Sequence, residues 1–280
     1  MQVIKSPKKL SLALNHLRRK GKRIGFIPTM GALHEGHLSL IRRAGRENDV
    51  VVVSIFVNPI QFGPKEDFKH YPRNLKRDEK LLKRENVDFL FAPSRTSIYP
   101  KRFRNFINPG PVARYLCGPK RPGHFRGVAT VVNRLFEMAK PDRAYFGQKD
   151  YQQARIIEEM VRRLKLPVRI KICPIIREKD GFAMSSRNFY LSKKERTLAP
   201  SLYRALLLTK KLVRSGEHSS EKVKKAIRHR LIGRVTKIDY IEVINPKTCA
   251  PVRLIRRPVL AALACFIGST RLIDNLLIKR

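Results

Sequence analysis

The sequence predicts an α/β protein with a doubly wound parallel sheet, followed by a smaller α+β domain. Short β-rich apolar runs alternate with helical patterns through the first two thirds of the 280 residues. The run from Val50 to Val57 is almost continuously apolar and β-branched, as expected of a strand buried on both faces. Beyond about residue 187 the alternation changes to two helices followed by strands.

The elements of the first part are predicted in order along the chain. A strand over 23–27 leads to a helix over 38–44, in which Leu38, Ile41 and Ala44 share one face. Further strands are predicted over 50–57, 87–91, 143–146 and 169–174, the last of them nearer an edge because it alternates polar and apolar residues. Further helices are predicted over 75–85, 127–139 and 151–164. Because ligands of such sheets bind at the carboxyl ends of the strands, the residues that follow strands are the candidates for a site.

The second part has a different pattern. Helices are predicted over 192–214 and 219–231, and strands over 238–243 and 258–267. No low-complexity linker separates the two parts, so we expect them to pack closely. The predicted domains are residues 1–180 and residues 181–280.

Composition limits the class of protein. No apolar run approaches the roughly 20 residues that a membrane-spanning helix needs, and the N-terminus lacks the pattern of a secretory signal. The four cysteines are dispersed, so neither a disulfide framework nor a zinc site is predicted. We expect a cytoplasmic protein without a membrane partner.

The charge is unusual, because 61 Lys and Arg against 22 Asp and Glu give a net charge of +39. Charge alone would predict a nucleic-acid-binding protein without catalytic activity. However, the basic residues are spread over both parts of the chain, with no basic arm and no nucleic-acid-binding motif. We therefore expect no specific nucleic-acid partner, and an attraction for anionic substrates instead.

Residues 28–37 connect the first predicted strand to its helix and contain a His-x-Gly-His motif. A strand that turns through glycines into a helix N-terminus forms an anion site, because backbone N–H groups and the helix dipole face the ligand. His34 and His37 lie on the same side of this entrance, so both imidazoles can reach one phosphate group. The alternative is that these histidines cap the helix or lie on the surface.

Polar residues also follow two other predicted strands. Asn58 and Gln61 offer neutral donors and acceptors that suit a hydroxylated or carboxylated small molecule. Lys149 can place a charge on a phosphate, and Gln153 lies one helical turn further along. The alternatives are an ordinary loop and a surface lysine at the start of a helix.

Three further features carry polar or charged groups. Residues 184–187, Met-Ser-Ser-Arg, combine two hydroxyls with a guanidinium that suits polyphosphate, or they form only a turn and a helix cap. Arg121 and His124 lie in a glycine-bracketed loop, where they clamp a phosphate or cap the next helix. Asp78 is a candidate ligand for Mg²⁺, or a surface charge on a helix.

Several common catalytic motifs are absent from the sequence. It contains no P-loop, no G-x-G-x-x-G fingerprint and no nucleophile elbow. A His-x-Gly-His motif combined with a lysine and a Ser-Ser-Arg loop fits nucleotidyl transfer, in which attack at the α-phosphate expels pyrophosphate.

Over nearly its whole length, the chain resembles the pantoate–β-alanine ligase (pantothenate synthetase) family. The motifs that carry the resemblance occur in the family's order, at residues 27–37, 54–62, 71–73, 121–125, 146–153, 184–188 and 270–275. The His-x-Gly-His motif alone occurs throughout a wide nucleotidyltransferase superfamily, so the combination is what is specific. Another adenylyl or cytidylyl transferase on the same scaffold is the rival interpretation.

The resemblance implies an ATP-dependent ligation in two steps. Pantoate attacks the α-phosphate of ATP to give pantoyl adenylate and pyrophosphate. The amine of β-alanine then attacks the acyl carbon and releases pantothenate and AMP. The resemblance further implies a homodimer, Mg²⁺ accompanying ATP, a Rossmann-like domain over 1–180 that binds ATP and pantoate, and a small C-terminal lid over 181–280.

The family's functional residues map onto this sequence position by position. The implied ATP-binding residues are Met30, Gly31, Ala32, Leu33, His34, Glu35, Gly36, His37, Gly147, Gln148, Lys149, Asp150, Ile176, Met184, Ser185, Ser186 and Arg187. The implied catalytic residues among them are His34, His37, Lys149, Ser185, Ser186 and Arg187. Pantoate and β-alanine are expected at Gln61, Gln153, Asn58, Arg121 and His124, and Mg²⁺ at Asp78.

Two points qualify this mapping. The family's assignment makes His37 a proton donor, but we expect it to act first as an electrostatic stabiliser, because forming an adenylate from a carboxylate needs no obligatory proton. Arg77 stands beside Asp78 where relatives often carry an acidic residue, so the alternatives for Mg²⁺ are Asp78, Glu79 through water, or mainly ATP itself.

Overall fold

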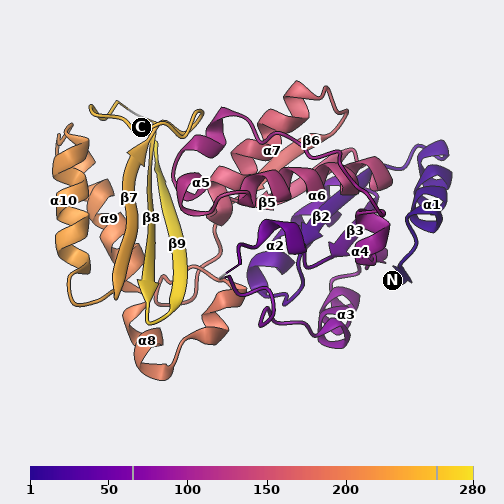
Figure 1. Cartoon of the computed structure of the whole chain (residues 1–280), viewed down its shortest axis with the longest axis horizontal. Coiled ribbons are helices and arrows are strands. Elements are labelled where there is room, and N and C mark those ends of the chain that lie inside the picture. Colours follow the sequence, from indigo (N-terminus) through magenta and orange to yellow (C-terminus); the bar gives the residue numbers. More distant parts are fainter. Residues whose placement is uncertain (65, 257, 280) are drawn as a thin grey trace.

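The computed structural model describes residues 1–64, 66–256 and 258–279. Its two sheets lie side by side in Figure 1, with the chain passing from the larger sheet to the smaller one. The larger sheet has six parallel strands: β1 (Gln2–Ile4), β2 (Ile24–Thr29), β3 (Val50–Ile55), β4 (Phe89–Phe91), β5 (Arg143–Gly147) and β6 (Arg169–Cys173).

The strand order of this sheet is β1-β4-β3-β2-β5-β6. From β2 the chain winds through β3 and β4 in one direction, and it returns to the other side of β2 with β5 and β6. The predicted doubly wound parallel sheet is therefore confirmed, with β6 at an edge as expected. The direction reverses between β2 and β5, which makes the carboxyl ends of these two strands the switch point where ligands of such sheets bind.

Helices cover both faces of the larger sheet. They are α1 (Pro7–Arg19), α2 (Glu35–Glu47), α3 (Leu75–Arg84), α4 (Arg95–Ile98), α5 (Cys117–Lys120), α6 (His124–Ala139) and α7 (Tyr151–Arg163). Neighbouring residues of a strand point to opposite faces, so Phe26 packs in a core with α1, α6 and α7, whereas Ile27 packs in another core with α2 and α3.

The smaller sheet is antiparallel, in the order β7 (Lys237–Ile244), β8 (Val259–Ile267) and β9 (Thr270–Ile278). It forms its own core with α9 (Ser201–Arg214) and α10 (Ser220–Leu231), which cover it in Figure 1, and α8 (Lys193–Leu198) precedes them. Leu260 and Ala262 of β8 also join the core of the first sheet, so the two parts pack closely, as expected.

The structure contains elements that were not predicted, among them the short helices α4 and α5, and it divides one predicted helix. The predicted helix over 192–214 is divided into α8 and α9, because Pro200 has no N–H to donate to the preceding turn. No element was predicted before residue 23, where β1 and α1 lie. Strand β9 was not predicted, because its apolar pattern is interrupted by two buried polar residues, Asp274 and Asn275. In the described part of the chain, no helix combines the length and apolar character needed to cross a bilayer.

Candidate active site

A cavity of about 230 Å³ lies at the switch point between β2 and β5. It brings together most of the predicted site residues: Met30, His34, Gly36, His37, Asn58, Gln61, Arg121, His124, Gly147, Lys149, Asp150, Gln153, Ile176, Met184, Ser185, Ser186 and Arg187. A larger cleft of about 720 Å³ is lined by residues of both sheets and shares several of these walls, including Lys149, Gln153 and Arg187. The cavity is therefore built from loops far apart in sequence.

His34 and His37 cap α2 and line the cavity at the same time. His34 Nδ1 accepts a hydrogen bond from the Gly36 backbone N–H at 3.1 Å, and His37 Nδ1 accepts one from the His34 N–H at 3.3 Å. In both rings Nδ1 is an acceptor, so each neutral imidazole carries its proton on Nε2. The prediction had backbone N–H groups facing the ligand. In the structure, the N–H groups of His34 and Gly36 are hydrogen-bonded to the histidine rings, so the ring Nε2–H groups are the donors that remain for a ligand.

The histidines are neutral near pH 7. Burial lowers the pKa of His34 from 6.5 to about 3, and the neighbouring His37 and the Lys149 ammonium lower this pKa further. Burial also lowers the pKa of His37 to about 4, again with a contribution from Lys149. The pair therefore offers uncharged N–H donors to a ligand, and the nearby positive charge comes from Lys149.

Asp78 fastens the loop between β2 and α2. Its two carboxylate oxygens accept hydrogen bonds from the backbone N–H groups of Ala32 and Leu33, both at 2.9 Å. The loop reaches this position through Gly31, whose φ of 81° favours glycine. Asp78 is only 1% exposed, so the alternative interpretation of a surface charge is wrong.

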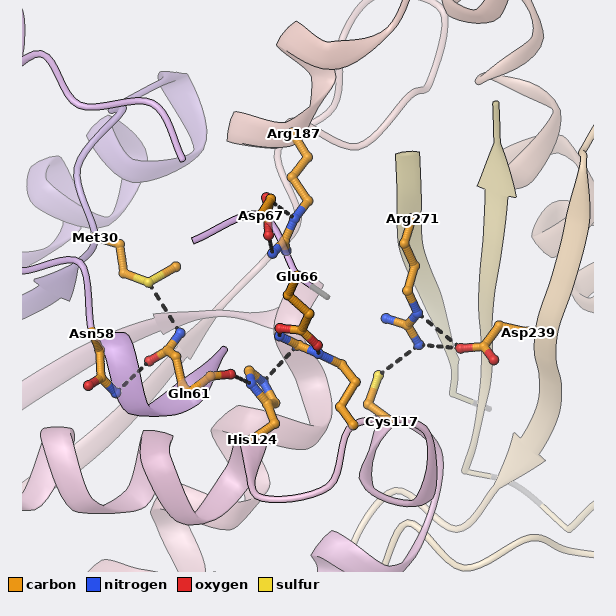
Figure 2. A network of polar contacts seen from close by, with 11 residues as sticks. Met30, Asn58, Gln61, Glu66, Asp67, Cys117, His124, Arg187, Asp239 and Arg271 are labelled. Carbon is orange, nitrogen blue, oxygen red and sulfur yellow. Dashed lines mark hydrogen bonds and ion pairs between the residues drawn. The ribbon is translucent and has the colours of Figure 1, made fainter. Parts of the chain in front are cut away.

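Gln61 is held in the cavity by a polar network (Figure 2). Its side-chain oxygen accepts a hydrogen bond from Asn58 Nδ2 at 2.9 Å, and its Nε2 donates to Met30 Sδ at 3.2 Å. Asn58 also donates to the Gly127 carbonyl at 3.2 Å and accepts from the Tyr99 hydroxyl at 2.8 Å. Both polar atoms of the Asn58 amide are hydrogen-bonded within the protein and Asn58 is only 1% exposed, so its role is to hold the Gln61 side chain in place.

His124 and Arg121 hold the backbone of the same glutamine, because His124 is hydrogen-bonded to the Gln61 backbone carbonyl. Arg121 can only donate, so His124 Nε2 accepts its hydrogen bond at 2.9 Å and His124 Nδ1 donates to the Gln61 carbonyl at 2.8 Å. Arg121 also forms a bidentate pair with Glu66, with both distances 2.6 Å. Burial and the Arg121 charge lower the pKa of His124 to about 4, so this ring is neutral as well.

Arg187, which lines the cavity, forms a bidentate ion pair with Asp67, which lines the larger cleft. Nε and Nη2 of Arg187 donate to the two carboxylate oxygens at 3.0 and 2.9 Å (Figure 2). Although burial acts to raise it, the bond to Arg187 and its charge hold the pKa of Asp67 below its usual value. The neighbouring Ser186 donates to the Ala32 carbonyl at 3.2 Å, which ties this segment to the loop after β2.

Comparison with known proteins gives a consistent result. The model of the family "Pantoate-beta-alanine ligase" matches residues 2–277. The chain is 52% identical to the pantothenate synthetase of Thermotoga petrophila over 98% of this chain and 99% of that protein. It is also 52% identical to that of Fervidobacterium nodosum, over 100% and 99% of the two chains.

The chain belongs to the pantoate–β-alanine ligase family.

Solved structures agree with this membership. The crystal structure of pantothenate synthetase from Thermus thermophilus superposes with a TM-score of 0.94 at 44% identity, and 100% of both chains is covered. The ligase of Francisella tularensis, whose structure is a complex with β,γ-ATP and β-alanine, superposes with a TM-score of 0.82 at 38% identity over 99% and 97% of the chains.

Not every residue mapped from the ligase family lines the cavity. Glu35 forms a surface ion pair with Arg42. Gln148 directs its amide to Asn275, with Nε2 donating to Oδ1 at 3.2 Å. Gly31, Ala32 and Leu33 do not line the cavity either. The contacts of these five residues with ATP remain predictions.

The structure also separates two adjacent glutamines of the ligase. Gln153, which the mapping selects, lines the cavity. Gln152 is directed away, where its Nε2 donates to the carbonyls of Val112 and Tyr115 at 2.9 and 2.6 Å. Helical spacing explains the difference, because successive residues of a helix point about 100° apart.

Several residues that support this cavity were not predicted from the sequence. Asp67 and Glu66 hold Arg187 and Arg121, and Tyr99 holds Asn58. Their partners lie far from them in the chain, so no local pattern indicates them. Tyr71, which lines the cavity, could have been found, because it belongs to one of the motifs that carry the resemblance.

Proposed function

We propose that the cavity between β2 and β5 is where this ligase activates pantoate with ATP, before β-alanine takes up the acyl group. The reaction is the ATP-dependent condensation of pantoate with β-alanine to pantothenate, AMP and pyrophosphate. The observation that carries the proposal is that two neutral imidazole donors, the Lys149 ammonium and the amide of Gln61 all border one cavity.

In the first step, a pantoate carboxylate oxygen attacks the α-phosphorus and the bond to the pyrophosphate oxygen breaks. Lys149 and the Nε2–H groups of His34 and His37 stabilise the charge on the phosphates. Ser185, Ser186 and Arg187 hold the polyphosphate, with Arg187 oriented by Asp67. No proton has to be transferred in this step, which fits the low pKa values of both histidines.

Pantoate is assigned to Gln61 and Gln153. Their neutral amides can orient its hydroxyl groups and carboxylate without a cation that would quench the nucleophile. Asn58, Arg121 and His124 act on pantoate and β-alanine through Gln61, because their polar atoms are engaged with it or with Glu66.

In the second step, the neutral amine of β-alanine attacks the acyl carbon and the bond from this carbon to the AMP oxygen breaks. AMP leaves with the electron pair, and the amine loses its proton to solvent. Residues 181–280 act as the lid of this reaction, which keeps water from the mixed anhydride. The separate apolar core that this part forms around the smaller sheet supports this division.

Mg²⁺ is expected to enter with ATP, but Asp78 does not fit the role of its ligand. Both of its oxygens accept backbone N–H groups, its side chain is only 1% exposed, and it does not line the cavity. Within residues 1–64, 66–256 and 258–279, no group of three or more His, Cys, Asp or Glu side chains could hold a metal ion. We therefore assign Asp78 to support of the loop and derive no step through the metal.

The resemblance also supports a homodimer that works in the cytoplasm, and analytical ultracentrifugation tests the dimer. The decisive test of the activity is a two-substrate assay. Pyrophosphate release should require both ATP and pantoate, mass spectrometry should detect pantoyl adenylate, and AMP should appear only after β-alanine is added. Equal turnover with a different acceptor would favour another nucleotidyltransferase on the same scaffold.

A further inference from the structure

Strand β9 contributes two adjacent buried polar residues to the junction between the two sheets. Asp274 is 4% exposed and Asn275 is 3% exposed. Burial of such groups is costly unless they are hydrogen-bonded. Because successive residues of a strand point to opposite faces, the two side chains reach different segments of the protein.

Asn275 reaches the turn that carries Lys149. Its Nδ2 donates to the backbone carbonyls of both Gln148 and Lys149 at 3.0 Å, and its Oδ1 accepts from Gln148 Nε2 at 3.2 Å. The turn, Gln148–Asp150, connects β5 to α7. A single amide of the smaller sheet therefore fixes the backbone from which the Lys149 side chain enters the cavity.

Asp274 anchors the segment on the other side of the cavity. Its carboxylate forms a bidentate pair with Arg177 at 2.7 and 2.9 Å, and it also accepts from the Asn275 backbone N–H at 2.7 Å. Arg177 donates to the Gly181 carbonyl at 3.0 Å and forms a β-bridge with Ala183. The segment that leads to Ser185–Arg187 is therefore held to β9 by the ion pair between Arg177 and Asp274.

We propose that Asn275 is a positioning residue for Lys149. It holds the turn so that the ammonium group meets the phosphates of ATP, and Asp274 holds the opposite segment in register with it. This inference rests on the proposed role of Lys149 in adenylate formation. Asn275 lines the larger cleft but not the cavity between β2 and β5, and its Nδ2 group donates to two carbonyls of the Gln148–Asp150 turn. Its influence on that step therefore passes through the turn.

Two substitutions separate positioning from bulk packing. Asn275→Asp keeps the shape of the side chain but replaces the donor with an acceptor that faces two carbonyls, and Asn275→Ala removes the contacts. Each variant should lower pantoate-dependent pyrophosphate release at least tenfold. The rate at which preformed pantoyl adenylate reacts with β-alanine should change less than twofold. Lys279→Ala, an exposed position directly after β9, is the control and should leave both rates unchanged.

A double-mutant cycle tests whether Asn275 acts through Lys149. Adding Asn275→Ala to Lys149→Ala should lower pyrophosphate release by less than twofold beyond Lys149→Ala alone. If the double variant instead lost activity by the product of the two single effects, the inference would be overturned. It would also be overturned if an Asn275 variant released pyrophosphate at the wild-type rate but released AMP without β-alanine. Circular dichroism and thermal unfolding confirm that the variants are folded. If the wild type itself releases no pyrophosphate with pantoate, the proposed function fails. If the wild type is active and the Asn275 variants match its rate, only the inference about Asn275 fails.

Discussion

His37 accepts a hydrogen bond from the backbone of His34 through Nδ1 at 3.3 Å, and the two imidazole rings lie with their centroids 4.1 Å apart. This contact links helix capping to ligand binding, since it fixes the protonated Nε2 of His37 as the remaining donor. The motif thus supplies a rigid pair of neutral donors beside Lys149.

The Nε2–H group of His37 is one preorganised donor of the cavity. His37→Ala should fold and lose about a hundredfold in the rate of adenylate formation, or about 3 kcal/mol, because one preorganised donor is removed. His37→Gln can place an amide N–H near the position of Nε2, so it should retain more activity than the alanine variant. Single-turnover measurement of pantoyl adenylate checks both variants. His16→Ala, an exposed histidine at the end of α1, is the control, and wild-type rates for His37→Ala would refute the assignment.

Stability should depend on pH through the buried histidines. The folded-state pKa values of His34, His37 and His124 lie at about 3, 4 and 4, below the usual 6.5. Between these values the unfolded chain binds more protons, so the free energy of unfolding is highest above about pH 6.5 and falls as the pH drops toward 4. Urea unfolding at pH 7.5 and pH 5.0 measures this difference. Equal midpoints at the two pH values would contradict neutral, buried rings.

Asp78 should support the loop and not the metal. Asp78→Ala leaves two backbone N–H groups without their acceptors and should cost about 1–3 kcal/mol of stability for each group left unsatisfied. The KM for ATP should rise, because the Met30–Leu33 loop loses its anchor. Added Mg²⁺ should not restore activity, whereas a lost metal ligand would show such rescue. Lys80→Ala, at an exposed position of the same helix, is the control.

Asp67 should tune Arg187 through both charge and orientation. Asp67→Asn removes the negative charge but keeps an acceptor, so the charge of Arg187 is no longer neutralised and the KM for ATP should stay the same or fall. Asp67→Ala removes the partner that orients the guanidinium, and kcat should fall severalfold. Steady-state kinetics distinguish the two variants. Asp49→Ala, which breaks a surface pair with Arg23, should change neither constant.

The local sequence pattern was enough to predict the parallel sheet of this protein and the loops that follow its strands. Apolar runs such as Val50–Ile55 define buried parallel strands, and short-range spacing places the His-x-Gly-His loop and Lys149 at the ends of strands. The resemblance then identified the family and the residues around the cavity. Strand β1 gave a weak local signal because it has three residues and pairs with β4, which lies far along the chain. Strand β9 pairs with the preceding strand β8, and its signal was weak because two buried polar residues interrupt its apolar pattern.

The tertiary structure alone decided what each polar side chain does. Asp78 could be read as a metal ligand or a surface charge, but it anchors residues more than 40 positions away in the chain. Asn275 supports the Lys149 turn across the junction of the two sheets. Periodicity reports only on neighbours within a few residues, whereas the partner of a buried polar group is chosen by the packing of remote segments.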